Sequence, residues 1–296
     1  MADVKAVNST GSTAVAGRAV DWYAVAWRLP VIAWQALFLV GPLLFMIAMS
    51  FFLVRNYRME VGFEPQNWQK VLGRGFFWDS YFFTLGLASL ATAVTTLIAF
   101  PAAFALAFKV SDSLRRWAIF FLIIPFFTSY LVRIFAWQVI LAESGVINAA
   151  LGFIGIGPYT MLNSKFGTLV GYLTLCLPLV VILHTFTLAS IDKRLIEAAR
   201  NLGCGPIRTV FTVIVPLAKA GLIVAAVFCF ILSFGDFVSP YYLGGSKPPT
   251  MPIMVVDTTK SGQQWPRASV VAVMMMITLL TVAFAAVGAA YRKRTR

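Results

Sequence analysis

Charged residues are scarce in this chain of 296 residues, at 12% of the sequence, whereas soluble domains carry roughly 25%. Hydrophobic residues instead make up 60%. A soluble core of this size could not hide so much apolar surface, so the composition excludes an ordinary cytosolic enzyme and a disordered protein. We therefore predict a polytopic membrane protein whose apolar side chains face lipid and one another.

Residues that hold metals or pair as disulfides are also few. His184 is the only histidine, which excludes a multi-histidine metal centre. Cys176, Cys204 and Cys229 show no paired spacing, so we predict neither a disulfide nor a metal site. No Gly-Lys dipeptide occurs, so the sequence lacks the phosphate-binding loop G-x-x-x-x-G-K-[ST] and cannot supply that ATP site.

Six apolar stretches are each long enough to cross ~30 Å of hydrocarbon as a helix. They are continuously apolar rather than alternating, which favours helices over strands. We predict an all-α protein with a six-span domain at 30–291, preceded by a flexible tail and interfacial helix at 1–29 and followed by a basic tail at 292–296. The predicted spans are 30–54, 80–108, 117–137, 166–188, 217–239 and 268–291.

The net charge of +13 follows the predicted topology. Lys and Arg gather in the N-terminal segment, the turn 109–116, the loop 189–216 and the C-terminal run YRKRTR. Because cytoplasmic loops are enriched in these residues, both termini are predicted to be cytoplasmic. The first external loop is an exception, since it carries Arg55, Arg58, Lys70 and Arg74.

The three external loops are long and rich in glycine, proline and aromatic residues. They cover 55–79, 138–165 and 240–267. We expect short re-entrant or interfacial helices in them, and together they are predicted to form a docking surface outside the membrane.

The cytoplasmic loop 189–216 is half polar and helical in character. Asp192 can cap a helix over Lys193–Leu202, and Gly203 then breaks that helix. Pro206 fits the first turn of a second helix, which leads to Pro216 at the start of the fifth span. From the residues alone, this helix pair is either an amphipathic connector on the headgroups or a docking element for a cytoplasmic partner.

The spacing within this loop resembles the EAA loop of ABC importer permeases. Glu197-Ala198-Ala199, Gly203 and Pro216 match that pattern in register, while Val213 and Val215 replace its usual Ile and Leu. Four further segments are similar to the permeases of spermidine/putrescine importers: Pro125–Trp137, Gly145–Gly155, Phe234–Gly245 and Gln263–Val273.

The resemblance implies one non-catalytic permease subunit of a type I ABC importer in a bacterial inner membrane. Its implied partners are a cytoplasmic ATPase dimer, a second and non-identical permease, a periplasmic substrate-binding protein and membrane lipid, with no nucleic acid. ATP and Mg²⁺ would be bound by the ATPase, and no cofactor by this chain. The segment around Glu197, Ala198, Ala199 and Gly203 would lie in a cleft on the ATPase and, with Pro216, couple its closure to the spans.

One acidic residue, Asp236, lies well inside a predicted span, where an acid costs about 2.5–3.5 kcal/mol on insertion scales. Arg133 is predicted at comparable depth. Asp236 could therefore form an ion pair with Arg133 or be reached by external water. It could also belong to an outer gate for a cationic solute, with aromatic neighbours that attract ammonium groups; these neighbours are Tyr130, Phe234, Tyr241 and Tyr242.

The resemblance implies a small cationic organic solute, most simply a polyamine such as spermidine or putrescine. An opine, another amine or a phosphonate is the alternative within the same class. A self-contained channel or secondary transporter would lack a docking loop and often contains an inverted repeat. The sequence contains the docking motif and no repeat visible by eye, and no nucleophile–base set supports a membrane enzyme.

Overall fold

The computed structural model describes residues 22–291, with side chains from residue 27 onward. Residues 1–21 of the segment predicted at 1–29, and the predicted basic tail at 292–296, lie outside the described residues. The chain divides into two units, residues 1–46 and 47–296, and each is described by itself.

Most of the first candidate span, Trp27–Met49, belongs to the first unit, and its most apolar part has no buried residue. It is built from α1 (Trp22–Gln35), a π-helical turn η1 (Ala36–Val40) and α2 (Gly41–Met49), which ends in the second unit. Pro42 is the second residue of α2. Because proline lacks a backbone N–H and its ring crowds the preceding turn, a widened π-turn before it is a natural accommodation.

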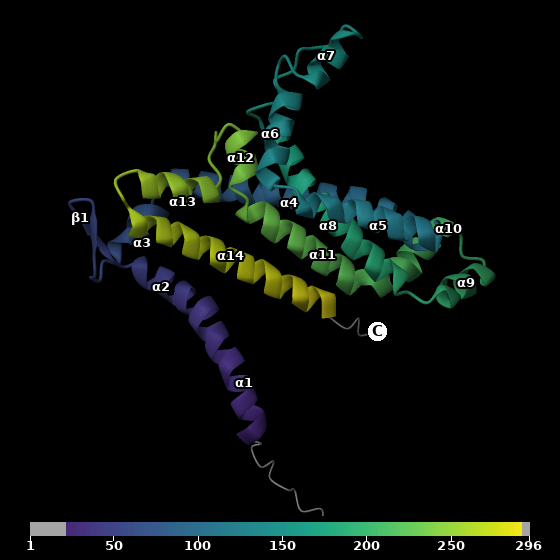
Figure 1. Cartoon of the computed structure of the whole chain (residues 1–296), viewed down its shortest axis with the longest axis horizontal. Coiled ribbons are helices and arrows are strands. Elements are labelled where there is room, and N and C mark those ends of the chain that lie inside the picture. The colour runs from purple at the N-terminus through teal and green to yellow at the C-terminus, as the bar shows by residue number, and fades with distance from the viewer. Residues whose placement is uncertain (1–21, 292–296) are drawn as a thin grey trace, which may run out of the picture. The chain divides into compact units, whose positions relative to one another are not determined.

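The second unit holds the remaining spans, and Figure 1 shows its long helices side by side. Within residues 22–291, six helical segments are long and apolar enough to cross a membrane, which confirms the predicted number. The helices are α3 (Gln66–Leu72), α4 (Gly75–Phe108), α5 (Asp112–Phe127), α6 (Tyr130–Leu141), α7 (Val146–Gly152), α8 (Lys165–Ala189), α9 (Lys193–Asn201), α10 (Pro206–Thr209), π-turn η2 (Val210–Ile214), α11 (Val215–Gly235), α12 (Val238–Tyr242), α13 (Met251–Lys260) and α14 (Trp265–Tyr291).

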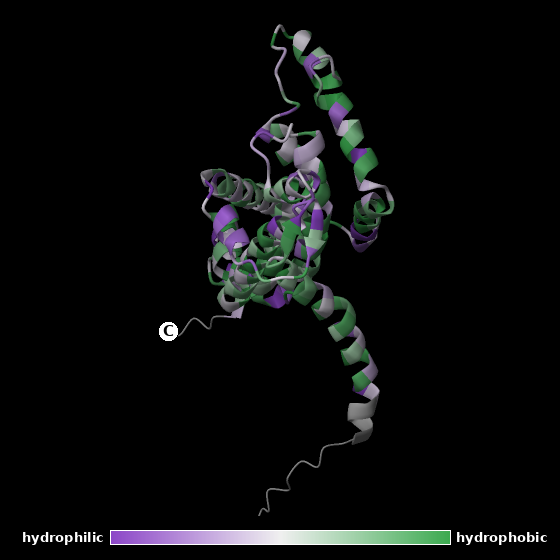
Figure 2. Ribbon diagram, turned by 90° about the vertical axis from the view of Figure 1, so that its left-hand side faces the viewer, coloured by the Kyte–Doolittle hydropathy of each residue, from purple (hydrophilic) through white to green (hydrophobic). Residues whose placement is uncertain are grey.

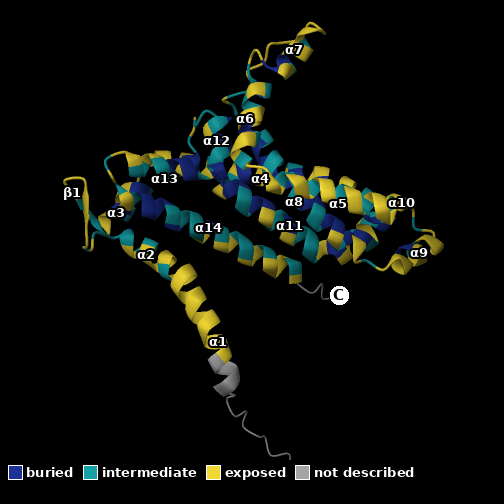
Figure 3. Cartoon of the chain, in the orientation of Figure 1, coloured by how far each residue is buried: buried dark blue, intermediate teal, exposed yellow. Residues whose placement is uncertain are grey.

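The core of this unit lies where α4, α8 and α11 pack together, with α14 against α11 (Figure 3). Cys176 and Val180 of α8 meet Ala99 of α4 and Ala225 of α11 in one buried cluster. Small residues at such contacts let membrane helices approach closely. At Gly221 a β-carbon would lie 2.3 Å from the Thr187 Oγ1, so α11 passes α8 there with only a glycine between. Figure 2 shows hydrophobic residues along these helices.

The third span is placed wrongly by the sequence. It was predicted as one helix over 117–137, but α5 ends at Phe127 and α6 begins at Tyr130, and the candidate span is Tyr130–Gly152. Thr128 ends α5, because its backbone is extended and its hydroxyl donates to the Pro125 carbonyl at 2.9 Å. α6 leaves the bundle, with α7 at its far end (Figure 1).

The all-α fold class is confirmed, but part of the first external loop, where short helices were expected, forms a small β-hairpin. Strands β1 (Leu53–Arg55) and β2 (Arg58–Glu60) pair antiparallel, with Leu53 opposite Glu60. Asn56 and Tyr57 both have positive φ angles, of 50° and 61°, as in the two-residue turns that match the twist of a hairpin. Strands this short leave too little alternation to be recognised in the sequence.

Candidate functional site

The first candidate site is the loop between the fourth and fifth candidate spans. Asp192 caps α9 as predicted, because its Oδ1 accepts from the Arg194 N–H at 2.9 Å. Two backbone bonds close the other end, from the Gly203 N–H to the Arg200 carbonyl and from the Cys204 N–H to the Ala199 carbonyl. This is a Schellman cap, and its left-handed position is Gly203 with φ +80°. The sequence therefore determines both ends of the helix.

One apolar side chain of α9 anchors the helix to the bundle. Ile196 is buried in a cluster with Ala103 and Ala107 of α4, Leu188 of α8 and Ile214 of η2. A cavity of about 380 Å³ lies beside it, lined by Glu197, Lys193 and Arg200 among others. The position of α9 is thereby linked through direct packing to three elements of the spans.

The rest of the helix pair faces outward. Glu197, Ala198 and Gly203 are exposed, and Ala199 is half-buried. Large apolar side chains are exposed beside them, with Leu202 at 88% and Ile207 at 74% exposure. Exposed apolar groups gathered on one surface indicate a contact with another molecule or with lipid. Figure 3 shows α9 mostly exposed.

The second helix of the pair begins at Pro206, at its first turn as predicted. It continues through η2 into α11, where Pro216 is the second residue and is exposed. The candidate fifth span is therefore continuous over Pro206–Gly235. α10 and α11 thus belong to one helical segment, and the turn at 202–205 joins α9 to it.

The second candidate site surrounds Asp236. The sequence placed this residue inside a span, but α11 ends at Gly235, and Asp236 follows it in extended conformation. Its carboxylate accepts from the Tyr130 hydroxyl at 2.7 Å and from the backbone N–H groups of Val238 at 2.8 Å and Ser239 at 3.2 Å. The Ser239 hydroxyl also donates to it. These donors offset the cost of burying an acid that is only 8% exposed.

The predicted ion pair between Asp236 and Arg133 is not formed among the residues whose side chains the structure describes. Arg133 instead donates from Nη1 to the Thr174 carbonyl at 3.3 Å, and its guanidinium carbon lies 5.5 Å from the centre of the Tyr130 ring. Tyr130 therefore lies between the two charges, bonded to one and stacked against the other. A neutral hydroxyl satisfies the acid in place of a cation.

The predicted aromatic residues are divided between two places. Phe234 is fully buried with Phe230 and Ala88 in the bundle, away from solvent. Tyr241 and Tyr242 lie in α12 with their ring centres 4.9 Å apart, and Tyr241 is exposed. The structure therefore brings Tyr130, Arg133 and Asp236 together and places Phe234 in the core.

Two residues of this cluster were missed by the sequence analysis. Ser239 bonds both Asp236 and Tyr130 through its hydroxyl. Asp236 stands just before α12, and an aspartate at the start of a helix is a capping residue, which could have indicated that Ser239 lies near it. Tyr172 of α8 is fully buried, and its hydroxyl has no hydrogen-bond partner within the described part of the chain. No local pattern marks it, because it lies far away in the sequence.

The described residues contain six candidate membrane spans, and an exposed helix pair leads into the fifth, as expected of a multi-pass membrane protein. The chain belongs to the family described as binding-protein-dependent transport system inner membrane component, whose model matches residues 95–296. It is therefore the permease subunit of an ABC importer and a multi-pass inner-membrane protein. Membership implies an ATPase and a substrate-binding protein as partners.

Two curated relatives have similar sequences. The chain is 28% identical to the spermidine/putrescine transport system permease protein PotB of Haemophilus influenzae, over 86% of this chain and 89% of that protein. It is also 28% identical to PotB of Escherichia coli, over 73% of this chain and 79% of that protein.

The fold is also found in a solved transporter. A chain in the crystal structure of a bacterial alginate ABC transporter, in complex with an alginate pentasaccharide-bound periplasmic protein, superposes with a TM-score of 0.71 at 17% identity. The superposition covers 93% of this chain and 96% of that chain.

Proposed function

We propose that this permease carries a polyamine, such as spermidine or putrescine, across the inner membrane. The observation that carries the proposal is the similarity to two spermidine/putrescine permeases along most of the chain. The cluster around Asp236 supports it, because a carboxylate beside a tyrosine suits a passing ammonium group. Energy comes from ATP hydrolysis in a separate ATPase dimer, which binds ATP and Mg²⁺; this chain is not catalytic and holds no cofactor.

The exposed helix pair is proposed to dock on that ATPase. Small Ala198 and Ala199 allow close approach, Glu197 presents a charge, and Gly203 shapes the turn. Ile196 fixes the pair to the bundle, and Pro216 lies where the pair enters the fifth span. Closure of the ATPase would thus turn the spans as a rigid body.

The Tyr130–Asp236 contact is proposed as part of the outer gate. In the described structure the carboxylate is fully satisfied within the chain. A cationic solute can meet it only when the Tyr130 hydroxyl moves away, so separation of α6 from α12 would expose the charge. Arg133 lies over the Tyr130 ring, Tyr242 packs on the same buried cluster as Tyr130 and contacts Tyr241, and Phe234 lies in the core.

The assembly is proposed to contain a second, non-identical permease and to have both termini in the cytoplasm. Lys109, Lys193 and Arg200 line one cavity beside α9, which suits the cytoplasmic side. The basic segments then contact lipid headgroups and the ATPase, and no nucleic acid is involved.

Transport by the whole importer tests the substrate. The permease pair, the ATPase and the binding protein are reconstituted in proteoliposomes, and uptake of labelled spermidine and putrescine is measured with and without ATP. We expect ATP-dependent uptake that unlabelled polyamine suppresses. Uptake of a phosphonate or an opine, with none of either polyamine, would overturn the polyamine assignment and keep the importer class.

A further inference from the structure

The cavity of about 380 Å³ beside α9 has a lining that the coupling role leaves unused. It lies at the end of the bundle where α9 and α10 are found (Figure 1), and its wall combines the C-terminal end of α4, one face of α9 and the segment α10–η2. The α9 side chains that line it share the helix face that carries the buried Ile196. Of the proposed coupling residues, Glu197 alone lines it, so the cavity lies on the bundle side of the helix pair.

Positive charge exceeds negative charge in this lining. Lys109 directly follows α4, and Lys193 and Arg200 lie two turns apart on α9, whereas Glu197 is the one acid that lines the cavity in the described chain. These four residues are exposed, and none of them forms an ion pair among residues 27–291. Like charges that packing brings together repel one another. An anion between the cations would relieve this repulsion.

The cations suit a phosphate group. Lysine and arginine both donate charge-assisted hydrogen bonds to phosphate oxygens, and a guanidinium fork such as that of Arg200 can donate two in parallel. Lys109 approaches from α4 and the other two cations approach from α9. A phosphate between them would therefore join two elements that are far apart in the sequence.

The rest of the lining is mostly apolar. Phe104 and Phe108 lie one turn apart on α4 with their ring centres 5.2 Å apart, and Ile207 of α10 is 74% exposed. Burial of such surface stabilises an alkyl chain, whereas a free phosphate has no apolar atoms to bury. The ligand that fits this lining therefore has an apolar part beside its anionic group.

The cavity joins the ends of two candidate spans. The second candidate span ends at Phe108, the fifth begins at Pro206, and both residues line the cavity. Spans end where the hydrocarbon core of a bilayer gives way to the headgroups. Basic pockets between membrane helices at this level bind the headgroups of anionic lipids. We therefore expect the cavity at the level of the lipid phosphates.

We propose that this cavity binds one anionic phospholipid, whose phosphate lies between the three cations and whose acyl chain lies against Phe104 and Phe108. The lipid bridges the end of α4 and the helix α9, so lipid as well as Ile196 holds the helix pair to the bundle. A lipid is favoured over an acidic protein segment because the cations occur together with span ends and aromatic side chains, on the bundle side of α9.

The test measures binding of a defined lipid to the whole importer. The importer is purified in detergent, freed of lipid and titrated with phosphatidylglycerol, and native mass spectrometry gives the fraction of complexes that carry one added lipid. Lys109→Gln/Arg200→Gln removes two cations of the cavity. The matched control, Arg116→Gln/Arg194→Gln, removes two exposed cations of α5 and α9 that do not line it.

We expect the wild type and the control to bind phosphatidylglycerol about tenfold more tightly than phosphatidylcholine, which has no net charge. The variant Lys109→Gln/Arg200→Gln should lose this preference, because two of the three cations are gone. Equal affinity of this variant and the wild type for phosphatidylglycerol would overturn the proposal. An equal loss in the control would also overturn it, because overall positive charge would then be the cause.

Hydrogen exchange tests the bridge between α4 and α9. Phosphatidylglycerol should slow backbone exchange at 193–201 about threefold or more in the wild type and the control, and leave the cavity variant unchanged. A ligand that binds only the closed form of a segment suppresses its local opening by mass action. Binding without protection of α9 would place the lipid elsewhere and would show the proposal to be wrong.

A free anion and the ATPase are the competing occupants. If inorganic phosphate displaces phosphatidylglycerol at millimolar concentration, the cavity is a site for a free anion and the proposal is wrong. It is also wrong if the cavity variant releases the ATPase in lipid-free detergent while the control retains it. Solute is absent throughout, so an incorrect polyamine assignment leaves this test unaffected.

Discussion

The Tyr130 hydroxyl donates to the Asp236 carboxylate at 2.7 Å, and this bond ties the start of α6 to the segment between α11 and α12. Tyr130 is the first residue of the third candidate span, and Asp236 directly follows the end of the fifth. Ser239 joins both through its hydroxyl. The acid of the candidate gate is therefore held by neutral donors, and the two hydroxyl donors, of Tyr130 and Ser239, can be removed one at a time.

We expect Asp236→Asn to raise the solute concentration for half-maximal uptake several-fold and to leave the binding protein's affinity for solute unchanged. The amide keeps the size of the carboxylate but loses the charge that would attract an ammonium group. Uptake kinetics in proteoliposomes and calorimetry on the binding protein measure the two quantities. If the solute concentration for half-maximal uptake were unchanged, Asp236 would not belong to the solute pathway.

Tyr130→Phe removes one donor and leaves the carboxylate with its bonds from Val238 and Ser239. We expect a loss of about 1–2 kcal/mol in the free energy of unfolding, as for one hydrogen bond to a charged group. Weaker binding of α6 to α12 should also raise ATP-independent leak of solute. Thermal unfolding in detergent measures the first effect, and efflux of solute from loaded vesicles without ATP measures the second. Slower efflux than from wild type would contradict a gate role for the Tyr130–Asp236 bond.

Glu197→Lys and Gly203→Asp are expected to uncouple ATP hydrolysis from transport without abolishing expression. The first reverses a charge on the exposed face of α9, and the second adds a side chain at φ +80°, where most residues are strained. Gly205→Ala is the matched control, because Gly205 has φ −64° and open space around it. Near-normal uptake by both purified variants would reject the coupling role.

Gly221→Ala should destabilise the bundle, whereas Gly86→Ala should not. The new methyl at Gly221 would lie 2.3 Å from the Thr187 Oγ1 and 2.9 Å from its Cβ, so α8 and α11 must separate. Overpacking of this kind costs about 1–3 kcal/mol. Gly86 has nothing within 4 Å, and its replacement leaves packing intact. The measurement is the thermal midpoint in detergent; equal midpoints would contradict the close helix contact.

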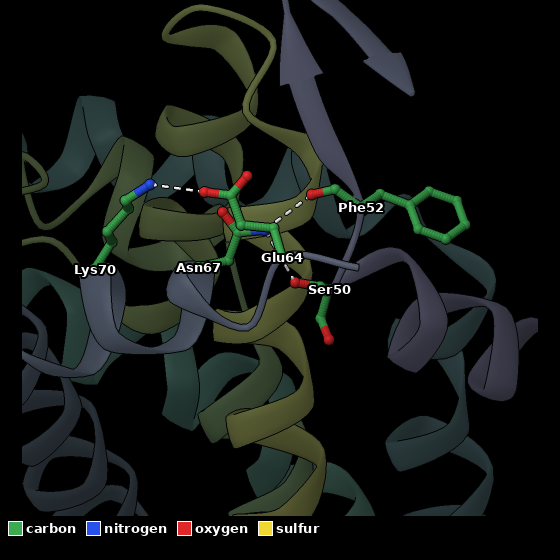
Figure 4. A network of polar contacts seen from close by, with 5 residues as sticks. All are labelled: Ser50, Phe52, Glu64, Asn67 and Lys70. Carbon is green, nitrogen blue, oxygen red and sulfur yellow. Dashed lines mark hydrogen bonds and ion pairs between the residues drawn. The ribbon is translucent and has the colours of Figure 1, made fainter. Parts of the chain in front are cut away.

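Asn67→Leu and Lys70→Gln separate two contacts that hold the base of the β-hairpin, and Figure 4 shows both. The Asn67 Nδ2 donates to the Ser50 carbonyl at 3.2 Å and to the Phe52 carbonyl at 2.9 Å. Loss of the Asn67 amide leaves two carbonyls without their donor, and we expect a cost of about 1–3 kcal/mol and faster proteolysis at 50–64. Lys70→Gln breaks only a partly exposed ion pair, which is worth about 0–1 kcal/mol. Limited proteolysis of the two folded variants compares their cleavage rates at 50–64. Faster cleavage of Lys70→Gln than of Asn67→Leu would show that the ion pair, and not the Asn67 amide, holds the hairpin.

Much of the fold follows from local pattern. Continuous apolar runs predicted the correct number of candidate spans. The capping residues Asp192, Gly203 and Pro206 predicted both helices of the loop that leads into the fifth span. Each of these signals lies within one continuous segment of the chain, so residues near one another in the sequence contain the information. The EAA spacing indicated the family for the same reason.

The failures come from very short elements, from contacts between distant segments and, in one case, from a local polar bond that interrupts an apolar run. The break at Thr128 depends on the bond to the Pro125 carbonyl, which competes with a hydropathy pattern that continues through it. The hairpin depends on Asn67, which binds carbonyls 15 and 17 residues away. The tyrosine that donates to Asp236 lies 106 residues away in the sequence, and no local pattern connects the two. The sequence instead suggested Arg133 as the partner, because it was predicted at a similar depth in the membrane.

The sequence by itself determined the membrane class, the number of spans and the helix pair, because hydrophobicity and capping are properties of adjacent residues. Only the tertiary structure decided which groups satisfy Asp236, that Phe234 belongs to the core, and that cations from two separate segments line one cavity beside α9. These depend on where separate helices meet, and a buried polar group takes whichever donor the packing brings within reach.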